Sequence, residues 1–121
     1  MRVWLSISIK LKTTTFRSFC ISCGSWATRR SPADASFILW NIDTLDWKNK
    51  DSDYLTDYVL KEVNDGNIIL FHDIHKTSID AINKLLPLLY VNGYQVVTVS
   101  KLAEVTDTKL EYHKSYRYFK K

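Results

Sequence analysis

The sequence is poor in the residues that mark several classes of protein. Its two cysteines, Cys20 and Cys23, are too few for a disulfide framework, and alone they are a weak signal for metal or redox chemistry. It has no run of about 18 apolar residues, so we expect no membrane span. The opening residues 1–7 are too short for the apolar core of a signal peptide, and no clean small-residue cleavage site follows them. The cellular location therefore stays open on composition.

Acidic residues are missing from the first 33 positions, which contain Lys and Arg but no Asp, Glu or His. Those positions therefore cannot supply carboxylate or imidazole ligands to a metal ion. The net charge is +4, with an acidic middle between two basic ends. A basic end can bind nucleic acid or an anionic surface, but no nucleic-acid motif supports that function here. We expect no nucleic-acid partner.

The composition changes abruptly after residue 33. Residues 3–10 alternate apolar and polar side chains, as a half-buried strand does, but residues 11–33 show neither a strand nor a helix period. Beyond residue 33, strand-like and helix-like segments alternate. We therefore expect three segments: an atypical basic leader (1–33), a folded region (34–105) and a basic aromatic tail (106–121).

Apolar runs predict three strands in the folded region, over residues 37–42, 67–71 and 94–99. Helical patterns lie between and after them. Strands joined by helices run parallel, with right-handed crossovers. The fold class is therefore α/β, with about three βα units.

A first helix is predicted from Asp51 or Ser52, either of which can cap it, to about Asn64. Its apolar side chains recur on one stripe, which indicates packing against the sheet. After the third strand, Ser100 is expected to cap a short helical turn that runs to Val105. Both helices fit the βα pattern.

A second helix is predicted after residue 76. Thr77 and Asp80 have the spacing of a capping box, and Asn92–Gly93 would end the helix. Pro87 falls inside it. Because proline costs about 3 kcal/mol within a regular helix, we expect a kink or a break there.

Polar and ionisable side chains gather where the first two predicted strands end. The C-terminal ends of parallel strands share one edge of a sheet, and α/β proteins place active sites there. We therefore expect the two groups to be neighbours. They are Asp43, Asp46 and Trp47 after the first strand, and His72, Asp73 and His75 after the second.

A carboxylate beside an imidazole fixes its tautomer and favours its charged form. The imidazolium can then donate a proton to a leaving group. Trp47 and Leu70 would add an apolar wall for a small acyl group. The alternative is that His72 and Asp73 only satisfy backbone groups at a strand end. Two His and three Asp on one sheet edge favour the functional interpretation.

These residues also carry a resemblance to a known family. The segments Asp43-x-x-Asp46-Trp47, Leu70-x-His72-Asp73-x-His75 and Gly93–Leu102 resemble the C-terminal half of a polysaccharide deacetylase, the NodB homology domain of carbohydrate esterase family 4. The resemblance covers about residues 34–105. It implies the C-terminal part of a distorted (β/α) barrel.

The resemblance implies hydrolysis of acetyl groups, at the C–N bond of an N-acetylated glycan such as peptidoglycan or chitin. The complete family domain holds zinc or another divalent metal. The implied partner is an acetylated polysaccharide, and the implied location is extracellular or the cell wall. By the same resemblance, His72 is the general acid, Asp46 tunes His72, and Trp47 and Leu70 line the acetate pocket. Supporting roles fall to Asp43, Asp73 and His75.

Several family motifs have no counterpart in this chain. The Thr-Phe-Asp-Asp-like segment and the His-x-x-x-His pair, which supply the base and the metal ligands, are absent. The Arg-Pro-Pro-Tyr-type motif is reduced to a faint echo in Arg30-Ser31-Pro32. We therefore expect a truncated, inactive copy that retains no metal, with a leader produced by truncation or frameshift. A partial barrel also leaves strand edges exposed, which favours self-association.

Two other functions compete with this interpretation. Cys20, Cys23, His72 and His75 could form a small metal-binding or redox module, although the His-x-x-His spacing is tighter than in zinc fingers. The basic ends could instead make the chain a non-catalytic module that binds an anionic polymer. Metal content would separate the first of these from a deacetylase fragment, and salt-dependent binding to a polyanion would separate the second.

Overall fold

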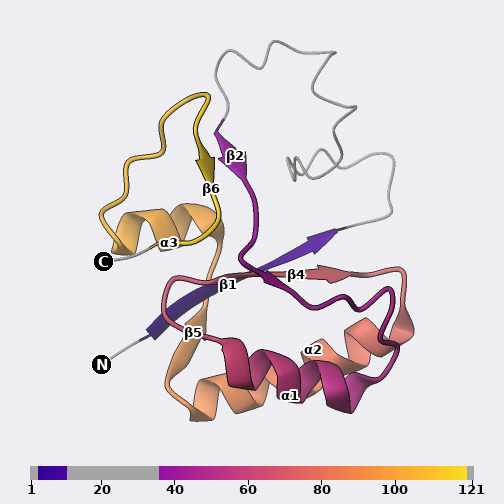
Figure 1. Ribbon diagram of the computed structural model, residues 1–121. Coiled ribbons are helices and arrows are strands. Elements are labelled where there is room, and N and C mark those ends of the chain that lie inside the picture. The colour runs from indigo at the N-terminus through magenta and orange to yellow at the C-terminus, as the bar shows by residue number, and fades with distance from the viewer. Residues whose placement is uncertain (1–2, 11–35, 120–121) are drawn as a thin grey trace.

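A four-stranded parallel sheet lies at the centre of the computed structural model, which describes residues 3–10, as backbone, and residues 36–119 (Figure 1). The strand order is β3–β4–β1–β5, and each neighbouring pair is parallel. The parallel arrangement predicted from the βα alternation is confirmed. The four strands are β1 (Val3–Lys10), β3 (Ile42–Asp43), β4 (Ile68–His72) and β5 (Tyr94–Val96).

Strand β1 occupies a central place in this sheet. It pairs with β4 from Ser6–Ile68 to Lys10–His72, and with β5 from Val3–Tyr94 onward. The alternation over residues 3–10 correctly predicted a strand. Its position separates β4 from β5, so strands that follow each other in the βα pattern are not all neighbours. The boundaries of the three predicted segments stay a prediction.

The single strand predicted over residues 37–42 is wrong. The segment forms two short strands in different sheets, β2 (Phe37–Ile38) and β3. Asn41 marks the change: its backbone N–H donates to the Ile68 carbonyl at 3.1 Å, and its side-chain oxygen accepts from the Ile68 N–H at 2.9 Å. These two bonds attach the chain to β4 at the point where it leaves one sheet for the other. The apolar run in the sequence does not indicate this change.

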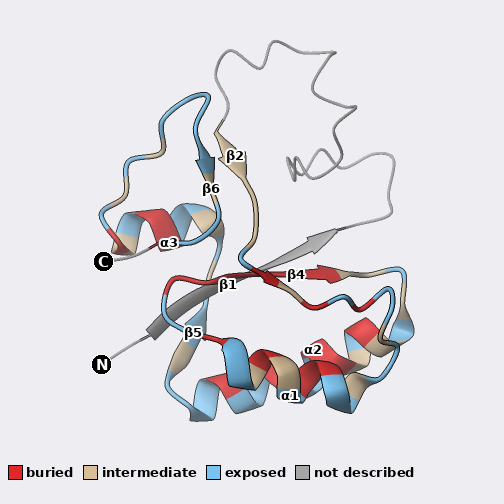
Figure 2. Ribbon diagram, in the orientation of Figure 1, coloured by how far each residue is buried: buried red, intermediate tan, exposed pale blue. Residues whose placement is uncertain are grey.

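Two helices cover one face of the sheet (Figure 1). They are α1 (Ser52–Glu62) and α2 (Lys76–Val91). Their sheet-facing sides are buried and their outer sides are exposed (Figure 2). Burying each large apolar side chain contributes about 1.5–3 kcal/mol relative to leaving it exposed. The fully buried members of this core are Leu55, Val59, Ile69, Phe71, Ala81, Leu85 and Leu89.

The N-terminus of α1 forms as predicted. Asp51 is the N-cap, and its carboxylate accepts from the backbone N–H groups of Asp53 at 2.9 Å and Tyr54 at 3.3 Å. These bonds satisfy two donors that the first helical turn leaves without partners. The helix ends at Glu62, close to the predicted Asn64.

The capping box predicted for α2 is wrong. The N-cap is His75, two residues before Thr77, and its side chain makes no capping hydrogen bond. Thr77 therefore lies within the first turn, and Asp80 pairs with Lys76 at 3.6 Å. The short turn after β4 starts the helix before the box residues are reached. Local spacing could not anticipate this.

At Pro87 the predicted break is wrong, because α2 is continuous from Lys76 to Val91, and the kink stays a prediction. Pro87 and Asn83 are both exposed. The Asn83 carbonyl, which loses its helical donor at the proline, can therefore bond to water. The helix does end at Asn92–Gly93, as predicted, with Gly93 at a φ of 85°. No helix in the described ranges is long and apolar enough to cross a membrane.

The C-terminal part packs on the other side of the sheet (Figure 1). Helix α3 (Val99–Val105) is capped by Thr98, whose hydroxyl accepts from the Lys101 N–H at 3.3 Å, so the predicted Ser100 cap is wrong. Because the helix begins at Val99, β5 is shorter than the predicted strand. Strand β6 (Ser115–Tyr116) pairs in parallel with β2. Phe119 is buried with Ile68, Leu102 and Ala103 in a second core.

Candidate active site

The two predicted groups of polar residues meet at the C-terminal ends of β3 and β4. These strands are neighbours, with Asp43 in register with Leu70. His72 is the last residue of β4, and Asp46 lies in the loop after β3. Asp46 Oδ1 and His72 Nδ1 are 2.6 Å apart. The predicted proximity of these side chains is confirmed.

Asp46 is fully buried and uses both of its carboxylate oxygens. Oδ1 faces the His72 imidazole. Oδ2 accepts from the His72 backbone N–H at 2.6 Å and from the Ser78 hydroxyl at 2.6 Å. Burial raises the pKa of Asp46, but the hydrogen bonds from Ser78 and from the backbone and side chain of His72 outweigh burial, so its pKa lies below the ordinary value. Asp46 is therefore ionised at neutral pH.

The ionised carboxylate fixes the protonation of His72. A carboxylate can only accept hydrogen bonds, so His72 Nδ1 must carry the hydrogen that points at Asp46. The other ring nitrogen, Nε2, is then the position that gains or loses a proton. The His72 side chain is 19% exposed, whereas Asp46 is at 0%. The pair thus consists of a fully buried carboxylate and a partly exposed imidazole that a substrate can reach.

The loop after β3 has a tight internal structure that turns Asp46 inward. Asp43 Oδ1 accepts from the Leu45 N–H at 3.0 Å, and Leu45 adopts a left-handed φ of 51°. A non-glycine residue in that region costs about 1–2 kcal/mol. The Leu45 carbonyl accepts from the N–H groups of Lys48 and Asn49, both at 2.9 Å. Asp43 therefore stabilises the loop that carries Asp46.

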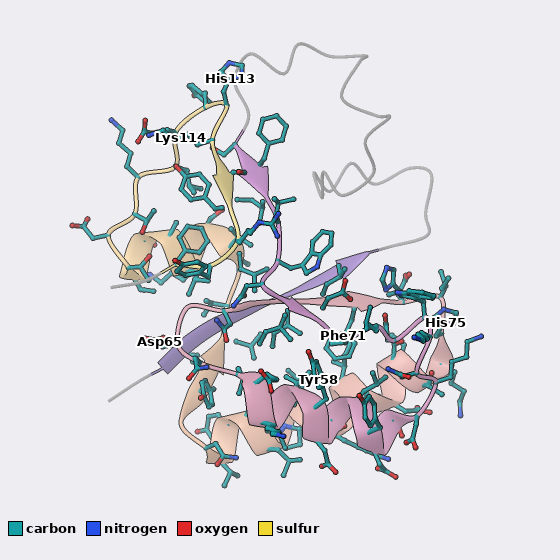
Figure 3. All side chains as sticks on the ribbon, viewed as in Figure 1. Tyr58, Asp65, Phe71, His75, His113 and Lys114 are labelled. Atoms are coloured by element: carbon teal, nitrogen blue, oxygen red, sulfur yellow. The ribbon has the colours of Figure 1, made fainter. Side chains whose placement is uncertain are left out.

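The remaining predicted residues lie close to Asp46 or His72 in the sequence. Trp47 is 52% exposed, and Leu70 is 3% exposed. One Asp73 oxygen is buried without a hydrogen-bond partner. His75 lies at the turn between β4 and α2, whereas His113 lies in the loop before β6, far across the molecule (Figure 3). The roles assigned to these residues stay predictions.

Two hydroxyl residues of the site escaped the sequence analysis. Ser78 donates to Asp46, and Thr44 donates to the Leu70 carbonyl at 2.8 Å. Thr44 lies inside the first motif, and Ser78 lies in the first turn of α2. The early helix start turns Ser78 toward the strand end. Placing the N-cap at His75 instead of Thr77 would have put Ser78 in the first turn of α2 and pointed to this residue.

The described residues do not fit a metal site. Over residues 36–119, no three His, Cys, Asp or Glu side chains gather in a way that could hold a metal ion. The alternative site of Cys20, Cys23, His72 and His75 cannot be placed, since both cysteines lie outside the described residues. We therefore derive no chemical step through a metal.

Known proteins match much of this chain, although no protein-family model matches it. A peptidoglycan-N-acetylmuramic acid deacetylase from Bacillus subtilis (strain 168), PdaC, is 42% identical over 76 residues, or 63% of this chain and 16% of that protein. A peptidoglycan-N-acetylglucosamine deacetylase from Listeria monocytogenes (strain 10403S), PgdA, is 39% identical over 79 residues, or 65% of this chain and 16% of that protein. The resemblance to polysaccharide deacetylases is confirmed. The chain spans about a sixth of the length of each relative.

Solved deacetylase structures share the fold. A T48 deacetylase with substrate has a TM-score of 0.62 and 40% identity, and the match covers 66% of this chain and 39% of that one. A family 4 acetyl xylan esterase from Clostridium thermocellum, in complex with a cobalt ion, has a TM-score of 0.64 at 24% identity over 70% of this chain and 44% of that one. At that identity the esterase supports the fold alone. The parallel sheet and the helices described above are thus a partial α/β barrel of the polysaccharide deacetylase type.

Proposed function

We propose that this chain carries the proton-donating part of a polysaccharide deacetylase site. The observation that supports the proposal is the 2.6 Å bond between buried Asp46 and His72 Nδ1, which leaves Nε2 as the exchangeable position. When the C–N bond of an acetamide breaks, the departing nitrogen needs a proton. The His72 imidazolium gives that proton from Nε2, and Asp46 stabilises the imidazolium before the transfer.

The proposed substrate is an acetylated glycan of the peptidoglycan type. The support comes from the relatives, which are deacetylases of N-acetylmuramic acid and N-acetylglucosamine in peptidoglycan. Trp47 directly follows Asp46 and is half exposed, so it offers an apolar surface for the acetyl methyl group. Leu70 contributes less, because it is almost fully buried.

The water-activating half of the reaction is proposed to lie outside the described residues. Hydrolysis needs a nucleophile, and the described residues provide no group that could hold a metal to activate water. The first 33 residues contain no Asp, Glu or His. We therefore expect the 121-residue chain to be inactive alone, and to need a segment that supplies a base and metal ligands.

Complementation tests this proposal. We expect no acetate release from acetylated peptidoglycan by the purified chain, with or without zinc. Adding the N-terminal half of a related deacetylase domain should restore release, and His72→Ala should lower the restored rate by roughly 10²–10⁴-fold. His113→Ala is the matched control, because His113 lies far from the pair.

Three outcomes would contradict parts of the proposal. Metal-dependent acetate release by the chain alone would show that the chain does not lack the water-activating half. A restored rate that His72→Ala leaves unchanged would overturn the acid role. A loss of rate in His113→Ala equal to that in His72→Ala would show that the effect is not specific to the pair.

A further inference from the structure

The Asp46 carboxylate is held by donors from two other elements of the fold. Its own loop follows β3, the His72 N–H belongs to the end of β4, and the Ser78 hydroxyl comes from the first turn of α2. Ser78 is fully buried, as is Asp46. Their 2.6 Å bond is therefore made without access of bulk water to either side chain.

The two donors on Oδ2 determine how the carboxylate faces the imidazole. A carboxylate can rotate about its Cβ–Cγ bond, and that torsion is broad in energy. With Oδ2 fixed by donors from a strand and from a helix, Oδ1 is left to accept from His72 Nδ1. Without Ser78, Oδ2 would keep one donor, the His72 N–H, and one of its buried lone pairs would have none.

We propose that Ser78 is a positioning residue that orients Asp46 and thereby holds His72 in the tautomer with hydrogen on Nδ1. Ser78 touches neither the imidazole nor the reacting atoms, and it acts through Asp46. The catalytic consequence rests on the proposed function, whereas the effect on the tautomer does not.

Ser78 also connects this geometry to the helix start. Its backbone N–H donates to the His75 carbonyl at 3.0 Å in the first turn of α2, while its hydroxyl reaches Asp46. The position of the helix is thereby linked to the orientation of the carboxylate. If Ser78 only filled space, its size would matter here and its hydroxyl donor would not.

Nitrogen-15 NMR of the histidine ring in the full 121-residue chain tests the proposal. In the native chain, neutral His72 should be almost entirely the Nδ1–H tautomer. Ser78→Ala should give a mixture with a measurable Nε2–H fraction, and carbon-13 titration should place the pKa of Asp46 higher than in the native chain. Thr106→Val is the matched control: Thr106 is a buried hydroxyl that bonds to the Leu102 carbonyl of α3 at 2.8 Å, on the other side of the sheet.

Two further variants separate donation from packing. Ser78→Cys keeps the approximate shape but donates weakly, so it should shift the tautomer toward the Ser78→Ala mixture. Ser78→Thr keeps the hydroxyl and should restore the native tautomer. If Ser78→Ala does not fold, the Cys and Thr variants still decide the question. A native tautomer in Ser78→Ala or in Ser78→Cys would overturn the inference.

The NMR result is independent of acetate release. If complementation restores no activity but Ser78→Ala still changes the tautomer, the proposed function fails and the positioning role stands. If His72→Ala abolishes restored activity while Ser78→Ala leaves the tautomer unchanged, the proposed function stands and the positioning role fails.

Discussion

Thr44 and Leu70 join the loop after β3 to the strand that carries His72. The Thr44 hydroxyl donates to the Leu70 carbonyl at 2.8 Å, and both residues are buried. Leu70 lies two residues before His72, and Thr44 lies two residues before Asp46. This bond therefore holds the two halves of the acid pair at a fixed separation.

Thr44→Val should lower the free energy of unfolding by about 1–3 kcal/mol, because it removes a buried donor and leaves the Leu70 carbonyl short of a partner. Urea unfolding measures the change. The matched control is Thr77→Val. The Thr77 hydroxyl is buried without a hydrogen-bond partner, so removing it should be neutral or stabilising. Equal losses in both variants would contradict this account.

Gly66 allows the C-terminal tail to approach the turn before β4. Its φ is 81°, and an added Cβ would lie 1.6 Å from the Phe119 carbonyl oxygen. Gly66→Ala should therefore displace the tail and destabilise the fold by more than the about 1–2 kcal/mol cost of left-handed backbone alone. Gly93→Ala isolates that backbone cost, because Gly93 has a φ of 85° with open space around it. Equal unfolding free energies for the two variants would exclude the close approach as the cause.

The depressed pKa of Asp46 predicts how stability depends on pH. The group is depressed in the folded state, so its contribution is fully present above its unfolded pKa of about 3.9. That contribution is lost as the pH falls through the lower folded pKa, because protons then bind the unfolded chain first. Urea unfolding between neutral pH and about pH 2 should show a loss in the native chain that is smaller in Asp46→Asn. An equal loss in both would assign the acid sensitivity to other groups.

The order of strands and helices was enough to predict the contact between Asp46 and His72. Parallel strands bring their C-terminal ends together whatever the loops do, so two motifs far apart in sequence could be placed side by side. The same reasoning missed Ser78, because the start of α2 depends on the turn after β4 and not on the local capping pattern. It also missed the change of sheet at Asn41, which depends on a pairing with distant Ile68.

Self-association through exposed strand edges remains a prediction from the sequence. The end of α2 carries Tyr90 and Val91, which are 80% and 82% exposed. Apolar side chains continue to the C-terminus of α2, and the packed structure shows which of them are covered.

Asp46→Asn should reverse the tautomer of His72. An amide in place of the carboxylate keeps one acceptor oxygen, which the His72 N–H and the Ser78 hydroxyl already occupy at Oδ2. The amide NH₂ then faces Nδ1, and a donor there requires Nδ1 to be an acceptor, so neutral His72 must carry its hydrogen on Nε2. The imidazolium also loses its counter-charge.

Nitrogen-15 NMR should therefore show the Nε2–H form of His72 in Asp46→Asn. Acetate release in the complemented system should fall by roughly 10²–10⁴-fold, as expected when a positioned acid is lost. Asp65→Asn serves as a control for a change of the same chemistry at the turn before β4, and it should retain the native tautomer and rate. An unchanged Nδ1–H tautomer in Asp46→Asn would mean that the carboxylate does not determine the protonation of His72, and the proposed proton donor would have to be abandoned.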